Sequence, residues 1–235
     1  MLFVLLAAGG LFLATVVPGM AAAEGDGGEH ALMCHIPFTG PEPLENRGST
    51  EIEYVSPMTA HRLAEALDDE GLLIGGPDRN DAGRIIGGPV RPRIDLSGWD
   101  GRTGTIAFDL APVHWGESAF SLVSSQDAGF GRFVCQKRGD ALRCIAIDTE
   151  PGKEGRWRIG IGSPEGMQNW QAGEWHHFAL VWREGASFAV YVDGQAISAR
   201  TGPFQWPDEF STIVLGGGQP PRTRIKNLRV YSRPL

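Results

Sequence analysis

The sequence predicts an all-β fold, a two-sheet antiparallel sandwich with one short helix in its N-terminal part. In residues 173–235, apolar runs of strand length alternate with short turns, and Asp193-Gly194 is a pair typical of two-residue β-hairpin loops. Upstream, Trp157, Ile159 and Ile161 alternate with Arg or Gly, which is the pattern of a strand with one buried face. Because such strands bury one face each, two sheets packed face to face are expected.

Alternation also predicts which side chains of the C-terminal strands point into the core, because successive residues of a strand face opposite sides of its sheet. The inward set is expected to be Phe178, Leu180, Trp182, Phe188, Val190, Val192, Leu228 and Val230.

The N-terminal half predicts short strands and one helix. Strands are expected over residues 31–38, 51–55, 72–74 and 84–87. Ser56 as N-cap and Pro57 at the first helical position predict the start of a helix that ends at Gly71. Its apolar face would consist of Ala60, Leu63, Ala64 and Leu67.

Four segments resemble motifs of the laminin-G-like, or concanavalin A-like, jelly-roll family. Residues 173–182 resemble its G-x-W-H-H-h-A-h-x-W motif, where h is apolar, and residues 190–195 resemble L-Y-V-D-G-Q. Residues 225–235 resemble I-x-x-h-R-h-Y-x-R-x-L, and residues 104–112 resemble G-T-h-x-F-x-h-x-P. The resemblance implies a jelly roll, with Trp175 and Trp182 at core positions. One fold hosts many functions, so it does not by itself identify a ligand.

The first 23 residues have the layout of a secretory signal peptide. Residues 2–17 are apolar apart from Gly and Thr, Pro18 breaks the run, and residues 21–23 offer a cleavage site of small residues. No Lys or Arg precedes the apolar run, and a retained membrane anchor is the alternative. We therefore expect a signal peptide (1–23), a flexible leader (24–28) and a single laminin-G-like jelly-roll domain (29–235) that is secreted or periplasmic.

The three cysteines of an exported chain allow at most one internal disulfide. Residues 133–147 read as a hairpin turning at Gly139-Asp140, which places Cys135 opposite Cys144 in a closely spaced pair. A disulfide between them is expected, and two buried thiols in the core are the alternative. Cys34 would remain free or pair outside the domain.

The sequence offers little evidence for catalysis. Jelly-roll glucanases use the strand pattern E-h-D-x-x-E, and Glu51-Ile52-Glu53 matches only part of it. His176 and His177 are neighbours on a strand and point to opposite faces, so they cannot ligate one ion from the same side. The family resemblance implies that they are structural histidines.

No cofactor is expected, although a structural Ca²⁺ remains an alternative because many members of the fold bind calcium through loop aspartates. The candidate ligands are Asp127, Asp148, Asp193 and Asp208, whose spacing defines no site. The net charge of −7 argues against nucleic acid as a partner.

The best candidate ligand-binding residues are Trp115, Trp170 and Trp206, which lie in expected loops beside Pro, Gly, Asn or Gln. A flat amphipathic ring beside amides suits sugar recognition, and packing beneath the loop is the alternative for each. The expected function is a non-catalytic, glycan-binding module. The alternatives are an envelope structural or adhesion component that binds proteins, and a polysaccharide-active enzyme such as a glycoside hydrolase or lyase.

Overall fold

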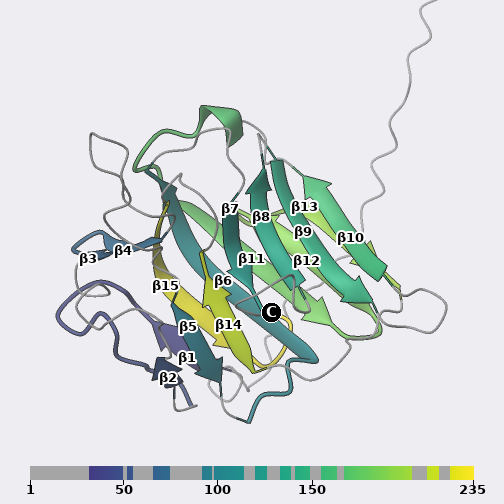
Figure 1. Cartoon of the computed structure of the whole chain (residues 1–235), viewed down its shortest axis with the longest axis horizontal. Helices are drawn as coiled ribbons and strands as arrows, with labels where there is room; N and C mark the ends of the chain where they lie inside the picture. Colours follow the sequence, from purple (N-terminus) through teal and green to yellow (C-terminus); the bar gives the residue numbers. More distant parts are fainter. Residues whose placement is uncertain are drawn as a thin grey trace, which may run out of the picture.

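The computed structural model describes two antiparallel sheets packed face to face (Figure 1). It describes residues 32–49, 52–54, 66–74, 92–96, 98–113, 120–125, 133–138, 141–148, 155–162, 167–202, 211–216 and 223–235. Sheet A contains β1 (Leu32–Ile36), β3 (Leu67–Asp68), β4 (Gly71–Ile74), β6 (Thr103–Pro112), β11 (His176–Arg183), β12 (Ser187–Val192), β13 (Gln195–Thr201) and β15 (Thr223–Tyr231). Sheet B contains β2 (Ile52–Tyr54), β5 (Arg93–Leu96), β7 (Phe120–Ser124), β8 (Phe133–Arg138), β9 (Ala141–Asp148), β10 (Gly155–Gly162) and β14 (Thr212–Leu215).

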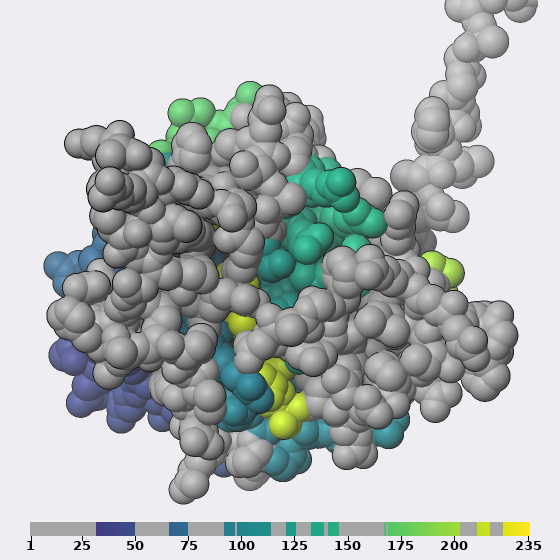
Figure 2. Space-filling model, viewed as in Figure 1, coloured from purple at the N-terminus to yellow at the C-terminus, as the bar shows by residue number. Residues whose placement is uncertain are grey.

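The chain crosses repeatedly between the sheets, as expected for a jelly roll. Sheet A has the order β13-β12-β11-β6-β15-β4-β3, with β1 also paired to β15, and sheet B has the order β10-β9-β8-β7-β14-β5-β2. Strands distant in sequence therefore become neighbours, such as β6 with β15. Figure 2, drawn from the same side as Figure 1, shows parts of sheet B on this face of the molecule, although most side chains of β8 and β14 are buried.

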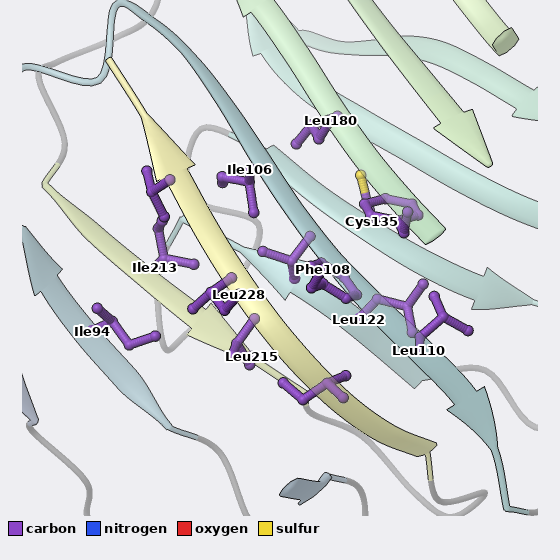
Figure 3. Close-up of a cluster of buried hydrophobic side chains, with 14 of the residues drawn as sticks. Ile94, Ile106, Phe108, Leu110, Leu122, Cys135, Leu180, Ile213, Leu215 and Leu228 are labelled. Carbon is purple, nitrogen blue, oxygen red and sulfur yellow. The ribbon is translucent and has the colours of Figure 1, made fainter. Parts of the chain in front are cut away.

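The core lies between the sheets and contains every side chain that alternation placed inward. Phe178, Leu180, Trp182, Phe188, Val190, Val192, Leu228 and Val230 are all at most 2% exposed. Figure 3 shows Ile106, Phe108 and Leu110 of β6 among core side chains of sheet B. The prediction of an all-β, two-sheet sandwich is confirmed, and so is this inward set.

Trp182 connects the two sheets. Its ring centroid lies 5.7 Å from those of Trp99 and of Phe133, which belongs to β8 in the opposite sheet. Its indole Nε1 donates a hydrogen bond to the carbonyl oxygen of Gly101 at 2.8 Å. A Cβ atom at Gly104 would come within 2.9 Å of the Trp182 ring, so the strand β6 needs glycine at this point.

The hairpin β8–β9 has the predicted register. Arg138 pairs with Ala141 and Cys135 with Cys144, and a disulfide joins the two cysteines, whose Cα atoms are 4.2 Å apart. Lys137 is also buried on the inward face of β8, which the apolar pattern did not predict. Cys34 of β1 is a free thiol, and burial raises its pKa to about 12, so it is unreactive in the folded domain.

The expected helix is wrong at its C-terminal end. Leu67 and Asp68 form β3, which pairs with β4 through a tight turn. The Asp68 carboxylate accepts hydrogen bonds from the backbone N–H groups of Glu70 and Gly71, and this stabilises a turn instead of a helical end. The remainder of the expected helix, at 56–65, and the expected strand at 84–87 lie outside the described residues.

Three other expected strands in the N-terminal half are present as β1, β2 and β4, each shorter than or close to its expected range. The signal peptide and leader expected over residues 1–28 lie outside the described part of the chain. Among the described residues, no helix has the length and apolar character needed to cross a membrane.

Replacing Trp182 with Ala should lower the free energy of unfolding by about 3 to 5 kcal/mol, because the ring is fully buried between the sheets. Trp182→Phe keeps an aromatic ring and loses the hydrogen bond to Gly101, so its cost should be about 1 to 2 kcal/mol. Urea denaturation followed by circular dichroism measures both. A loss below about 1 kcal/mol for the Ala variant would show that Trp182 does not connect the sheets.

Candidate functional site

The candidate site lies where the loop before β11 meets the end of sheet A. The loop contains a 3-10 helix, Met167–Asn169, whose Met167 side chain is fully buried. Gly173 N–H donates to the carbonyl oxygen of Pro112 at the end of β6, at 2.8 Å. These two attachments fix the loop against the sandwich.

Trp170 follows this 3-10 helix and stacks on His176, the first residue of β11. The ring centroids are 3.5 Å apart and the planes differ by 11°. The Trp170 side chain is partly buried and packs against the core. One face of the indole is therefore held by the imidazole below it.

His176 is itself held by the turn after β12. Its Nδ1 forms a hydrogen bond with Asp193 Oδ2 at 2.8 Å, and Asp193 Oδ1 accepts the backbone N–H of His177 at 2.8 Å. Asp193 has a φ of 50°, which the Asp-Gly turn accommodates. The His176 side chain is 8% exposed, and Glu174 Oε2 lies 3.7 Å from its Nε2. The hairpin turn thus positions the imidazole on which Trp170 rests.

His177 points to the outer face of sheet A and joins a polar row across three strands. Its Nδ1 forms a hydrogen bond with Asp109 Oδ1 of β6 at 2.9 Å, and Asn227 Nδ2 of β15 donates to Asp109 Oδ2 at 2.7 Å. Burial raises the pKa of Asp109, but the hydrogen bonds from His177 and Asn227 outweigh it and hold the pKa below its ordinary value. Asp109 is therefore a carboxylate at neutral pH.

Trp175 is half-buried and lies outside the core cluster, which corrects the core position that the resemblance implied. The ammonium of Lys226 sits 3.7 Å from the centre of its ring, a cation–π contact. The reason is alternation: His176 faces inward, so the residue before it faces away from the core. The prediction that Trp182 is a core residue is confirmed.

The structure places some of the predicted site residues and not others. Of the three candidate tryptophans, Trp170 is described as above, while Trp115 and Trp206 lie outside the described residues, so a shared platform stays a prediction. Asp193 is engaged by the two histidines. Asp127 and Asp208 lie outside the described residues, and the side chain of Asp148 is not described.

Among the described residues, no group of three or more His, Cys, Asp or Glu side chains could hold a metal ion. Glu53 lies on β2 at the edge of sheet B, and Glu51 lies outside the described residues. Sequence reasoning missed Asp109, Asn227 and Lys226. The position of Asp109, a carboxylate within an otherwise apolar strand, could have indicated that it has polar partners on neighbouring strands.

Replacing Asp109 with Asn should destabilise the domain by about 1 kcal/mol at pH 7, because the charged hydrogen bonds to His177 and Asn227 are weakened. Because the pKa of Asp109 is lower in the folded than in the unfolded protein, its ionised form stabilises the fold at any pH above the unfolded value of about 3.9. This contribution is lost as the pH falls through the folded pKa. The difference between wild type and variant should therefore shrink below about pH 4.

Urea unfolding at a series of pH values measures this difference. Asp69→Asn, in the exposed turn between β3 and β4, is the matched control and should change little at any pH. Equal stability of Asp109→Asn and wild type at pH 7 would contradict the role given to Asp109.

Known structures with the same architecture include several botulinum neurotoxin binding domains. One is a type C toxin whose cell entry is described as dependent upon interaction with two ganglioside molecules, with a TM-score of 0.61. Two others are binding domains of toxin DC, one in complex with rat synaptotagmin II (TM-score 0.61) and one with SialylT (TM-score 0.60). Each is 10% identical and matches 88% of this chain and 49% of its own, so this chain spans about half the length of these structures.

At this identity the likeness shows the fold alone. A comparison with curated proteins finds no match. Residues 98–235, which contain β6 to β15 and both histidines of the site, match the family described as the concanavalin A-like lectin/glucanases superfamily. The chain belongs to that superfamily.

Proposed function

We propose that this chain is an exported, non-catalytic binding module that recognises glycan through loop aromatics, Trp115, Trp170 and Trp206. The observation that carries the proposal is the fixed orientation of Trp170, stacked on His176, which is bound to Asp193. A ring held in advance loses little conformational freedom when a sugar stacks against it or packs at its edge.

The surroundings of Trp170 fit a sugar. Gln171 and Glu174 are exposed beside the ring, and Glu174 Oε2 accepts the backbone N–H of Gln171 at 3.0 Å. Gln171 Nε2 donates to the carbonyl oxygen of Asn169 at 2.6 Å. Polar groups with ordered geometry next to an amphipathic ring are the usual composition of a saccharide site.

A non-catalytic role is supported by the hydrogen bonds that the carboxylates at this end of the sheet make within the fold. Asp109 is bound by His177 and Asn227, and Asp193 by His176 and the backbone of His177. Each of these carboxylates positions other groups of the fold. Export is supported by the layout of residues 1–23 and by the disulfide between Cys135 and Cys144, since disulfides persist in oxidising compartments.

A protein partner is the second candidate, with the domain as an envelope structural or adhesion component. One structure of the same fold is a complex with the protein rat synaptotagmin II, and another belongs to a toxin whose cell entry is described as dependent upon interaction with two ganglioside molecules. Domains of this architecture are thus associated with both protein and ganglioside partners. The arrangement around Trp170 favours glycan, because the exposed side chains of Gln171 and Glu174 place amide and carboxylate groups beside the ring.

Glycan array screening of the mature domain, followed by calorimetry on the best oligosaccharide, should give a dissociation constant of about 10 μM to 1 mM and no turnover. Trp170→Ala should weaken binding at least about tenfold, which corresponds to about 1.4 kcal/mol. The matched control is Trp175→Ala, since that ring is already covered by Lys226, and its affinity should stay within about twofold.

Circular dichroism melting establishes that both variants are folded. Glycan binding that is indifferent to Trp170 would overturn the site, and binding of a protein alone would favour the second candidate.

A further inference from the structure

A buried ring nitrogen of His176 lacks a hydrogen-bond partner. The His176 side chain is 8% exposed, and within the described part of the chain its Nε2 bonds to no other group. Buried polar atoms are almost always hydrogen-bonded, because an unsatisfied one forfeits the bond that it makes to water in the unfolded chain. Nε2 therefore requires a partner that the described residues do not supply.

The other ring nitrogen decides what kind of partner Nε2 can take. Nδ1 lies 2.8 Å from Asp193 Oδ2, and a carboxylate oxygen only accepts, so Nδ1 carries the proton of the neutral imidazole. Nε2 of that tautomer presents a lone pair. The partner that fits it is a hydrogen-bond donor.

Glu174 adds a second acceptor at the same place. Its Oε2 lies 3.7 Å from His176 Nε2, which is too far for a hydrogen bond but close enough for both atoms to share one donor group. The Glu174 side chain is 47% exposed, so the two atoms span the boundary between the interior and solvent. We call Glu174 Oε2 and His176 Nε2 the acceptor pair.

Donors in the surrounding segments bond elsewhere. Gln171 Nε2 donates to the carbonyl oxygen of Asn169 at 2.6 Å, and the backbone N–H of Gln171 donates to Glu174 at 3.0 Å without reaching the imidazole. The ammonium of Lys226 lies over the ring of Trp175, 3.7 Å from its centre. These contacts leave the acceptor pair available to a donor from outside the chain.

Two acceptors that face one point select the chemistry of that donor. A sugar hydroxyl has a single hydrogen and can donate to only one of them. A primary amine has two hydrogens, an ammonium has three, and a positive charge strengthens the bond to a carboxylate. The net charge of −7 also attracts cations to this chain. The acceptor pair therefore favours an amine over a hydroxyl.

We propose that the acceptor pair is an amine-binding subsite, and that the glycan recognised beside Trp170 carries a free amino group, as a de-N-acetylated amino sugar does. The subsite rests on the proposed function and adds a chemical class to its ligand. Trp170 stacks on the same imidazole, with ring centroids 3.5 Å apart. Two stacked rings present their edges side by side, so a sugar at the edge of the indole can extend its amino group to Nε2 with a small shift of the Glu174 side chain.

Calorimetry with chitosan, chitin and cellulose oligosaccharides of equal length tests the subsite. These probes share one backbone and differ in a single substituent on each ring, which is an amine, an acetamide or a hydroxyl. Wild type should bind the chitosan probe at least about tenfold more tightly than the cellulose probe. Glu174→Gln should bring this ratio to about one, because it removes the charge and supplies an amide that can itself donate to Nε2.

The matched control is Asp100→Asn, which removes the same charge from an exposed turn before the opposite end of β6. Its ratio of chitosan to cellulose affinity should stay within about twofold of that of wild type. Equal losses for Glu174→Gln and Asp100→Asn would show diffuse attraction of a cation to an acidic protein and would overturn the subsite.

Nuclear magnetic resonance of the His176 ring nitrogens gives a readout that a purely structural role for Glu174 would not move. The Nε2 resonance should shift when the chitosan probe binds, and it should shift much less with the cellulose probe at equal occupancy. An Nε2 resonance that does not respond to the chitosan probe would also overturn the subsite.

The outcomes separate the subsite from the loop site. Equal affinities for the chitosan and cellulose probes, both weakened by Trp170→Ala, would overturn the subsite and leave the glycan proposal in place. Failure of all glycans to bind, with the domain folded by circular dichroism, would overturn both. Binding of a lysine-containing peptide in place of the sugars, with the same dependence on Glu174, would assign the amine to a protein partner and overturn the amino-sugar proposal.

Discussion

The pairing of β6 with β11 is the constraint on which the rest of the structure depends. The register runs without a break from His176 opposite Leu110 to Arg183 opposite Thr103. On its inner face it brings together Phe108 and Phe178, whose ring centroids are 4.9 Å apart. On its outer face the same register places Asp109 opposite His177 and Ala107 opposite Ala179. A slip of one residue would exchange the two faces, burying Asp109 and exposing Phe108.

The core fixes this register from the inside. Trp182 of β11 contacts Phe133 of sheet B and Trp99 beside the start of β6, so β11 cannot slide without emptying the space between the sheets. Glycine at position 104 is what allows β6 to pass so close to that ring. In sheet B, on the other side of the core, the disulfide between Cys135 and Cys144 joins β8 to β9. The packing of the core therefore also fixes the relative positions of the side chains on the outer face of sheet A, such as Asp109 and His177.

The sequence predicted what depends on local alternation and short turns. The inward residues of β11, β12 and β15 and the register that pairs Cys135 with Cys144 follow from periodicity within one strand or hairpin. The helix prediction failed at Leu67, where helical spacing competed with a turn stabilised by the Asp68 carboxylate. Pairing of β3 with β4, which itself pairs with β15, favoured the turn.

The candidate site was less predictable because its contacts join distant segments. The bond between His176 and Asp193 spans a hairpin, but Asp109, His177 and Asn227 meet only because β6, β11 and β15 become neighbours. Likewise, no local pattern relates His35 to Arg229, which are brought together when β1 pairs with the last strand. Trp170 was identified from its loop composition, whereas the imidazole that supports it was assigned a structural role with no partner named.

The most direct measurement of the central claim is a set of interstrand proton contacts by nuclear magnetic resonance in the folded domain. The register predicts nuclear Overhauser effects linking Ala107 with Ala179 and Phe108 with Phe178, across the centre of sheet A. Strong Hα–Hα contacts, which mark directly opposed residues, that instead linked Ala107 with Phe178 or Leu180 would reveal a slipped register. That result would contradict the placement of the polar row at Asp109, because this register sets Asp109 opposite His177.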